Sequence, residues 1–304
     1  MSLSSVLRAC CWRGLGRRCR KPVRAKAVTA PLFAGFEGAR LHWNGHDCLV
    51  QTNHIPGKGM ARHYAAALAE GAQGFRDTLP ERCDPLERWH CARAEAPEAL
   101  IVWGAVHFDQ PPDPIGHAQR LAAILGPHDK LLAVTEPAVG FDVSGYTCTE
   151  ATALAAAIMG AALAVNPELR FWTCDPVHHC REELWVATDA LMRLFGSAIE
   201  AVGVNYHGCH AGDPLRDVLR MAADRYPAHR IAITETSWHD GLPAAEARFP
   251  HIRSRSDWWQ HVQAEIDASG VPIVCAVWEP WLDMSWDSGA PWPNGWPAHQ
   301  MEVT

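Results

Sequence analysis

Long apolar runs are missing from this chain of 304 residues, since none approaches the roughly 18 residues needed to span a membrane. The first thirty residues also lack the continuous apolar core of a secretory signal. The 11 cysteines have no regular spacing, and some of them, such as Cys174 and Cys275, lie within apolar runs. These features favour reduced cysteines in a cytoplasmic protein that does not enter a membrane.

Acidic residues are absent from residues 1–30, which carry eight Arg and Lys side chains. The net charge is −7 for the whole chain and therefore about −15 for the remainder. A chain this acidic is a poor candidate for binding nucleic acid through its folded part. We expect residues 1–30 to form a basic, disordered extension, with a basic contact arm or a targeting segment as alternatives. Residues 31–304 show no internal repeat or linker and are expected to form one domain.

Short apolar runs alternate with helical stretches after residue 31. The apolar runs lack polar alternation, as in parallel strands that are buried on both faces. One helical stretch opens with Thr147 and Glu150 at the spacing of a capping box. The predicted strands are residues 32–37, 72–77, 100–108, 131–136, 169–174, 201–206, 230–235 and 273–279. The predicted helices are residues 60–71, 83–98, 115–125, 147–165, 181–201, 214–226 and 256–269, with 83–98 the weakest.

Eight strands with helices between them indicate an α/β fold, a single-domain (β/α)8 TIM barrel. The chain length suits such a barrel, which usually takes about 250 residues. A doubly wound sheet is the alternative, but it seldom needs eight strands. From about residue 287 the tail has no helical pattern, so we expect the last barrel helix to be missing or irregular.

Functional side chains of such a barrel lie at the C-terminal ends of its strands. Glu136 ends the fourth predicted strand, directly before Pro137, and Glu235 ends the seventh. Two carboxyl groups that meet in space are what acid/base hydrolysis of a sugar bond requires. Taken singly, any of these residues could equally be a polar cap on a strand. The other strand-end residues are Glu37, Arg76, His107, Thr135, Asn205, Tyr206, Trp278 and Glu279.

The strand ends resemble those of the clan A glycoside hydrolases, in particular the family 1 β-glycosidases. Thr135-Glu136-Pro137 is similar to the Asn-Glu-Pro that carries the clan's acid/base after strand 4. Ile233-Thr234-Glu235 is similar to the Ile-Thr-Glu that carries its nucleophile after strand 7. Further similar segments, in the family's order, are FEGA (36–39), Arg76 on the second strand, HFDQP (107–111), GVNY (203–206) and VWEPWLDMSW (277–286).

This resemblance implies a retaining glycosidase or transglycosidase that acts on a glycoside or small oligosaccharide and needs no cofactor. Glu235 would be the nucleophile and Glu136 the acid/base. Arg76 would keep Glu235 ionised, and Tyr206 would donate a hydrogen bond to it. Trp278 would stack on the sugar ring, with core packing as the alternative. The implied substrate-binding residues are Glu37, Arg76, His107, Thr135, Asn205, Tyr206, Trp278 and Trp286.

Three departures from the family pattern concern residues that hold the sugar. Thr135 stands where the clan has Asn, Gly35 where family 1 has Gln, and Ser285 where it has Glu. The catalytic pair is intact while these residues are not, which indicates a divergent clan member. The same departures keep open a non-catalytic descendant that binds sugars without cleaving them.

The 17 histidines raise the alternative of a metal-dependent barrel hydrolase. HGCH (207–210) is the best candidate cluster, because it follows the sixth predicted strand at the expected end of the barrel. The first predicted strand does not end in the His-x-His that metal-dependent barrel hydrolases usually have. Solvated loop histidines and no catalytic metal are therefore the favoured interpretation.

Overall fold

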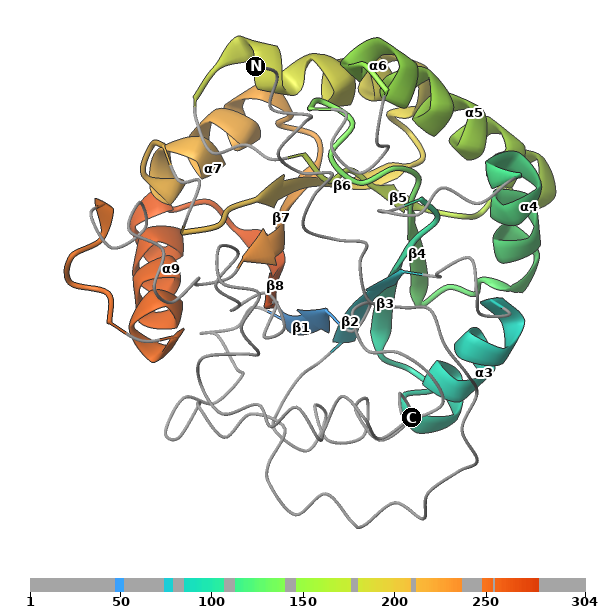
Figure 1. Ribbon diagram of the computed structural model, residues 1–304, viewed down its shortest axis with the longest axis horizontal. Coiled ribbons are helices and arrows are strands. Elements are labelled where there is room, and N and C mark those ends of the chain that lie inside the picture. The colour runs from blue at the N-terminus through green and yellow to red at the C-terminus, as the bar shows by residue number, and fades with distance from the viewer. Residues whose placement is uncertain are drawn as a thin grey trace, which may run out of the picture.

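The computed structural model describes residues 47–51, 74–78, 85–106, 113–139, 146–175, 180–208, 212–236, 248–253 and 255–278. Eight parallel strands close into a barrel in the order of the sequence, with helices around the outside (Figure 1). This confirms the predicted (β/α)8 barrel. The strands are β1 (Asp47–Gln51), β2 (Gly74–Thr78), β3 (Leu100–Gly104), β4 (Asp129–Leu132), β5 (Phe171–Trp172), β6 (Ile199–Asn205), β7 (Arg230–Thr236) and β8 (Ile273–Trp278).

The first strand differs from the prediction. Asp47–Gln51 occupies the barrel position between β8 and β2, pairing with both neighbours in parallel. The assignment of residues 32–37 as the first barrel strand is therefore wrong. Residues 32–37 and residues 47–51 are two short runs of similar apolar content. Only pairing with β8, which is distant in sequence, decides which of the two forms the first strand. Residues 32–37 themselves lie outside the described residues.

The helices agree with the prediction wherever the structure describes them, apart from one boundary. Residues 181–201 do not form a single helix. A 3-10 turn covers Glu182–Trp185, α6 ends at Phe195, and β6 begins at Ile199. The capping box of α5 is confirmed, since Thr147 and Glu150 exchange hydrogen bonds. The predicted helix 60–71 and the tail after residue 278 lie outside the described residues. The helices are α3 (Pro85–Glu95), α4 (Pro114–Ile124), α5 (Cys148–Val165), η1 (Glu182–Trp185), α6 (Val186–Phe195), α7 (Leu215–Arg225) and α9 (Arg255–Ser269).

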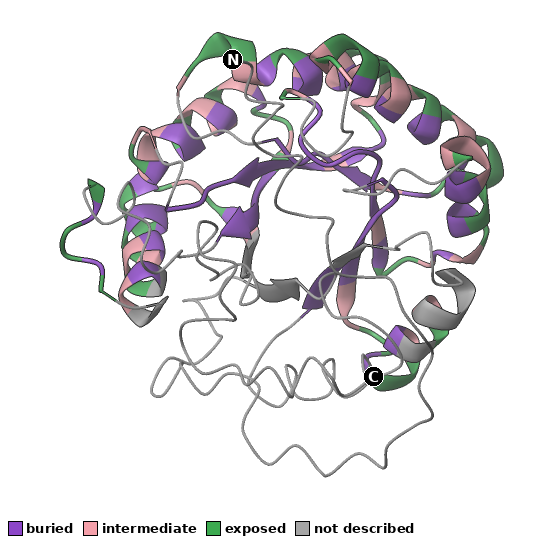
Figure 2. Cartoon of the chain, in the orientation of Figure 1, coloured by how far each residue is buried: buried purple, intermediate pink, exposed green. Residues whose placement is uncertain are grey.

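The core has an inner and an outer layer, because successive strand residues point to opposite faces of the sheet. The outer layer packs strands such as β3 and β7 against the surrounding helices (Figure 2). The inner layer fills the barrel with Val102, Leu132, Trp172, Cys174, Ala201 and Ala232. Gly203 also faces inward, where a Cβ atom would lie 2.0 Å from the Thr173 carbonyl oxygen. Only glycine therefore lets β5 and β6 approach this closely.

Helix α5 has the length and composition of a membrane span, with a mean hydropathy of 1.7 over 18 residues. The expectation that no stretch would meet this criterion is therefore wrong. The helix packs in the ring around the barrel, and Ala151, Ala155, Ile158 and Ala162 face the core. One such helix is weak evidence for a membrane segment, because the core helix of a soluble protein passes the same test.

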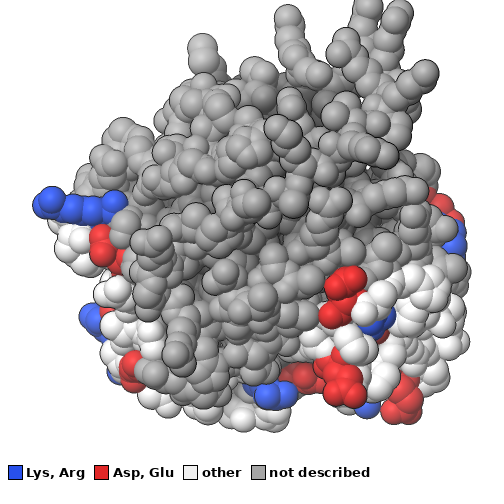
Figure 3. Space-filling model, turned by 90° about the horizontal axis from the view of Figure 1, so that it is seen from below, with Lys and Arg blue, Asp and Glu red and all other residues white. Residues whose placement is uncertain are grey.

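The charged side chains that Figure 3 shows are mixed in sign, with acidic and basic groups close to one another at the edges of that face. Among the described residues of the whole molecule, several charged side chains are paired, for example Lys130 with Glu200 at 2.9 Å and Arg225 with Asp189 at 2.6 Å. Surface pairs of this kind contribute little to stability, about 0–1 kcal/mol each.

Candidate active site

Glu235 faces the interior of the barrel because β7 contains a bulge. Along β6, Val204 is opposite Ile233 and the next residue, Asn205, is opposite Glu235, so Thr234 is an extra residue in β7. An extra residue of this kind breaks the alternation of a strand and re-aims the next side chain. Thr234 and Glu235 consequently both point inward, whereas the hydroxyl of Thr236 accepts a hydrogen bond from Trp258 of α9 outside the barrel.

Two side chains from other strands hold the Glu235 carboxylate. Arg76, fully buried on β2, forms an ion pair with its Oε1 atom. His207, just after β6, lies with Nε2 at 3.2 Å from its Oε2 atom. Arg76 also donates to the Thr135 hydroxyl at 3.2 Å. A buried arginine needs a carboxylate partner, and Glu235 supplies it.

Glu136 follows β4 with an unusual backbone conformation. Its φ angle of 52° is the one positive value at a non-glycine residue within the described part of the chain. This left-handed conformation costs a residue with a side chain about 1–3 kcal/mol, so the surroundings must maintain it. The Glu136 amide donates to the carbonyl of Cys174 at 2.7 Å, and Asn205 Nδ2 donates to its Oε1 atom at 2.8 Å.

The two glutamates meet at one end of the barrel. An oxygen of Glu136, an oxygen of Glu235 and a ring nitrogen of His207 all lie within 4.8 Å of one another. The two carboxyl groups are mostly buried, with exposed fractions of 9% for Glu136 and 6% for Glu235. Carboxyl groups about 5–5.5 Å apart flank the scissile bond in retaining glycosidases, whereas inverting enzymes keep them about 6.5–9.5 Å apart. With one oxygen of each within 4.8 Å of the other, the two groups lie close enough to flank a single bond.

A hydrogen-bond chain beneath the glutamates fixes the amide of Asn205. Its Oδ1 atom accepts from the Thr234 hydroxyl at 2.8 Å and from the Cys174 thiol at 3.1 Å. The amide nitrogen is thereby directed at Glu136. Burial raises the pKa of the Cys174 thiol well above its usual value, although the Arg76 charge opposes this. Cys174 therefore acts as a neutral donor rather than as a reactive thiolate.

Tyr206 does not occupy the place that we expected beside Glu235. Its ring stacks on Trp258 at a centroid distance of 5.9 Å, outside the barrel. Its hydroxyl donates to the backbone carbonyl of Asp213 at 2.9 Å, and burial raises its pKa above the usual value. Asn205 points inward to Glu136, and the alternation of β6, which no extra residue interrupts here, turns Tyr206 outward. The nitrogen of His207 lies where the tyrosine hydroxyl was expected.

Sequence reasoning missed the roles of His207 and Cys174. His207 follows Asn205 by two residues, and Cys174 follows Trp172 by two residues, so strand alternation places the members of each pair on the same face. Applied to the strand ends, this rule would have directed His207 and Cys174 into the barrel and Tyr206 out of it. His207 was instead assigned to a possible metal cluster and Cys174 to the core.

The structure describes only some of the remaining predicted site residues. Thr135 lies within the site through its contact with Arg76. Trp278 ends β8 at the same end of the barrel, and its side chain lies outside the described part. Glu37, His107 and Trp286 also lie outside the described residues, so their substrate-binding roles stay predictions.

The site residues also form a group that could ligate a metal ion. Glu136, His207 and Glu235 offer two carboxylate oxygens and one imidazole nitrogen, which are ligands of divalent transition metals. His207 belongs to the HGCH cluster, whose Cys209 and His210 lie outside the described residues. Arg76 already neutralises Glu235, and its positive charge opposes a cation at the same place.

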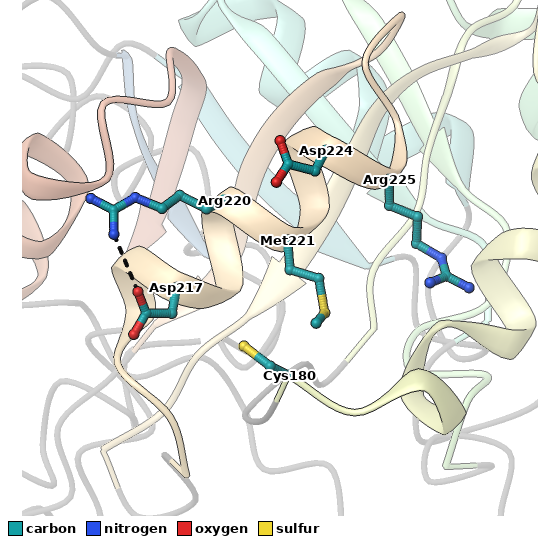
Figure 4. A pocket seen from close by; sticks show the side chains of 6 residues that line it. All are labelled: Cys180, Asp217, Arg220, Met221, Asp224 and Arg225. Carbon is teal, nitrogen blue, oxygen red and sulfur yellow. Dashed lines mark hydrogen bonds and ion pairs between the residues drawn. The ribbon is translucent and has the colours of Figure 1, made fainter.

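A separate hollow of about 480 Å³ lies on the outer surface beside α7 (Figure 4). Three of its four charged side chains are already paired, since Arg220 contacts Asp217 at 3.3 Å and Arg225 contacts Asp189 at 2.6 Å. The hollow is therefore not a second candidate site. Its lining residues are Cys180, Asp217, Arg220, Met221, Asp224 and Arg225.

Comparisons with known proteins establish the fold. No protein-family model matches the chain, and no curated protein matches its sequence. A thermostable mutant of the xylanase Xyn10A from Cellvibrio japonicus is similar in structure, with a TM-score of 0.55, 13% identity and coverage of 77% of this chain and 86% of that chain.

Two other solved structures are similar. The xylanase XynB from Paenibacillus barcinonensis has a TM-score of 0.53 and 12% identity, over 83% of this chain and 88% of that chain. A GH53 catalytic domain from Ignisphaera aggregans has a TM-score of 0.50 and 13% identity, over 79% of this chain and 86% of that chain. The chain thus shares the TIM-barrel fold of these solved structures, and the likeness does not single out family 1.

Proposed function

We propose that the protein is a retaining glycoside hydrolase, a divergent member of clan A, that cleaves a glycoside or small oligosaccharide. The observation that carries the proposal is the meeting of Glu136 and Glu235, with oxygens within 4.8 Å of each other and Arg76 paired to Glu235. Two carboxyl groups held this close repel each other when both are ionised. In a glycosyl transfer one carboxyl group acts as the ionised nucleophile and the other as the protonated acid, which explains why two such groups lie side by side.

In the first step Glu235 attacks the anomeric carbon of the sugar. The bond from that carbon to the leaving oxygen breaks, and the proton of Glu136 moves to that oxygen. Arg76 and His207 orient the attacking carboxylate through its two oxygens. Asn205 donates to Oε1 of Glu136 and so orients the carboxyl group that carries the transferable proton.

In the second step water attacks the glycosyl-enzyme. The ionised Glu136 takes a proton from the water, and the bond from Glu235 to the sugar breaks. The hydrogen bond from Asn205 stabilises the ionised form of Glu136 that this step requires. If a second sugar replaces water, the same residues perform transglycosylation.

Mutants of the two glutamates test these roles because they should fail differently. Glu235→Ala removes the nucleophile and should abolish turnover of every substrate. Glu136→Ala should still form the glycosyl-enzyme from a dinitrophenyl glycoside, whose leaving group needs no proton, and then stall. Azide needs no general base, so it should restore turnover and yield a glycosyl azide of retained configuration.

The wild-type protein should first be screened with aryl glycosides of different sugars. A 2-deoxy-2-fluoro glycoside with a good leaving group should then add one sugar mass to Glu235, detected by intact mass and peptide mapping. Equal loss of activity in both mutants without azide rescue would argue against the assigned roles. Sugar binding without turnover or labelling would instead favour the non-catalytic descendant, which the departures at Gly35, Thr135 and Ser285 keep open.

A metal-dependent hydrolase is the second candidate, supported by the grouping of Glu136, His207 and Glu235. Elemental analysis of the purified protein, together with activity before and after treatment with a chelator, separates the two. A stoichiometric divalent metal whose removal abolishes turnover would favour the metal-dependent reaction. Turnover that is unaffected by chelation would favour the glycosyl-enzyme route.

A further inference from the structure

Asp175 is a buried carboxyl group to which the mechanism above gives no part. It follows β5 and forms an isolated parallel bridge with Val204 of β6. Its side chain is completely buried, with an exposed fraction of 0%. A buried carboxylate costs free energy unless its hydrogen bonds compensate it, so the partners of Asp175 indicate what it does.

Both oxygens of Asp175 accept hydrogen bonds, and one of them holds the turn that carries Glu136. The Oδ1 atom accepts from the backbone amide of Ala138 at 3.0 Å. The Oδ2 atom accepts from the hydroxyl of Thr188, in the first turn of α6. The carboxyl group therefore ties the chain after β4 to the helix that follows β5.

Residues 174 and 175 hold this turn at two points. The Cys174 carbonyl accepts from the amide of Glu136 at 2.7 Å, and the turn closes by a bond from the Val139 amide to the Glu136 carbonyl at 3.2 Å. Pro137 has no amide hydrogen, so Ala138 offers the next backbone donor after Glu136. Asp175 accepts that donor, which fixes the turn on the far side of Pro137.

Glu136 needs such a restraint because its φ angle is 52° and it precedes a proline. Residues before proline prefer extended conformations, so this backbone would relax if it were released. We infer that Asp175 is a positioning residue for the acid/base Glu136, which it keeps in the left-handed conformation through the amide of Ala138. The inference rests on the function proposed above.

Burial supports a role beyond stability for Asp175. Burial raises the pKa of its carboxyl group to about 6, although the hydrogen bonds from Thr188 and Ala138 lower it. At neutral pH the folded protein thus keeps an ionised carboxylate in an unfavourable place. Costs of this kind commonly persist where function requires them.

Leaving-group dependence tests this role, since only poor leaving groups need the proton of Glu136. Asp175→Ala should lower kcat/KM for a phenyl glycoside by about tenfold or more, which is part of the 10²–10⁴-fold that general acids contribute. For the dinitrophenyl glycoside the loss should stay below about threefold. Asp175→Asn should recover most of the rate, because its Oδ1 can accept from Ala138 and its amide can donate to Thr188.

A double mutant provides the second measurement. If Asp175 acts through Glu136, adding Asp175→Ala to Glu136→Ala should cause no further loss on the phenyl glycoside, whereas independent effects would multiply. Asp129→Asn is the matched control, because it alters a buried carboxylate at the opposite end of the same barrel. It should lower the thermal midpoint and change the rates on both leaving groups equally.

Equal losses on both leaving groups in Asp175→Ala and Asp175→Asn would overturn the inference, as would multiplicative losses in the double mutant. Thermal midpoints of all variants show which are folded, and Asp175→Leu, which has a similar shape and also lacks both acceptors, serves if the alanine variant is not. If Glu136→Ala itself shows no leaving-group dependence, the proposed function fails and the inference with it. If Glu136→Ala shows that dependence and Asp175→Ala does not, only the inference fails.

Discussion

Strand β4 has a buried carboxyl group at each end, and the two differ in how the protein uses them. Asp129 begins the strand and is 2% exposed, while Glu136 follows its other end and is 9% exposed. Trp103 donates to Oδ1 of Asp129 at 2.7 Å, and Trp89 and the amide of Gly126 donate to Oδ2 at 3.1 and 2.8 Å. Arg93 completes the set through an ion pair with Oδ1.

The buried carboxyl groups at the two ends of β4 therefore have different roles. Each oxygen of Asp129 accepts two hydrogen bonds, so the carboxylate is fully engaged in joining β4 to α3 and β3. At the other end a left-handed residue, a bulge and two adjacent carboxyl groups occur together. None of these improves packing, and such features gather where a protein performs chemistry. The N-terminal end of a TIM barrel generally serves stability and the C-terminal end function.

The largest effect should come from Glu235→Gln at the C-terminal end. The amide keeps an oxygen for Arg76 but cannot attack the anomeric carbon, so kcat should fall by more than about 10⁴-fold while the protein stays folded. Initial rates on a dinitrophenyl glycoside and thermal unfolding by circular dichroism measure the two quantities. A Glu235→Gln variant that keeps a tenth of the wild-type kcat would contradict the assignment of function to the C-terminal end of the barrel.

Asp129→Asn should have the opposite outcome. The amide group would face donors where the carboxylate accepted them, leaving two buried donors without an acceptor, so the free energy of unfolding should drop by about 3 kcal/mol. Arg93 keeps its bonds to the carbonyls of Ala96 and Ala99 at 3.1 and 2.7 Å, which limits the loss. Urea unfolding measures the change, and kcat of the folded fraction should match the wild type. A selective loss of kcat would contradict the structural role of Asp129.

The sequence predicted the barrel because its strand and helix signals are local. Continuous apolar runs marked β2 to β8, and the capping box at Thr147 marked the start of α5. The first strand was misplaced because two apolar runs competed and only pairing with β8 selects Asp47–Gln51. Residues 181–201 were merged into one helix because the strand residues after Ile199 continue its apolar pattern.

The candidate site was predictable as a pair of strand-end glutamates, but not in its supporting groups. Glu136 and Glu235 follow apolar runs and are visible from the sequence alone. The bulge at Thr234 arises from pairing with β6, which no local pattern encodes. The turn after Glu136 is held through Ala138 by Asp175, which is distant from it in sequence. The misassignment of Tyr206 was avoidable, because strand alternation directs His207 inward instead.

Asp175→Asn should produce the smallest of these effects, a change in how stability depends on pH. The pKa of Asp175 is raised by burial from 3.8 to about 6 on folding. Between these values the folded state binds more protons than the unfolded state, so ionisation of Asp175 lowers the free energy of unfolding as the pH rises from about 4 to about 7. The contribution is on the order of 2 kcal/mol. The asparagine variant, which stays neutral, lacks this contribution.

Relative to the wild type, Asp175→Asn should therefore gain stability as the pH rises from 4 to 7 and change little above pH 7. Urea unfolding of both proteins at a series of pH values isolates the difference, because titrations common to both cancel. A constant difference between Asp175→Asn and the wild type would show that Asp175 titrates normally. Its burial would then carry no cost, and the support drawn from that cost for the positioning of Glu136 would be lost, leaving the contact with Ala138 alone.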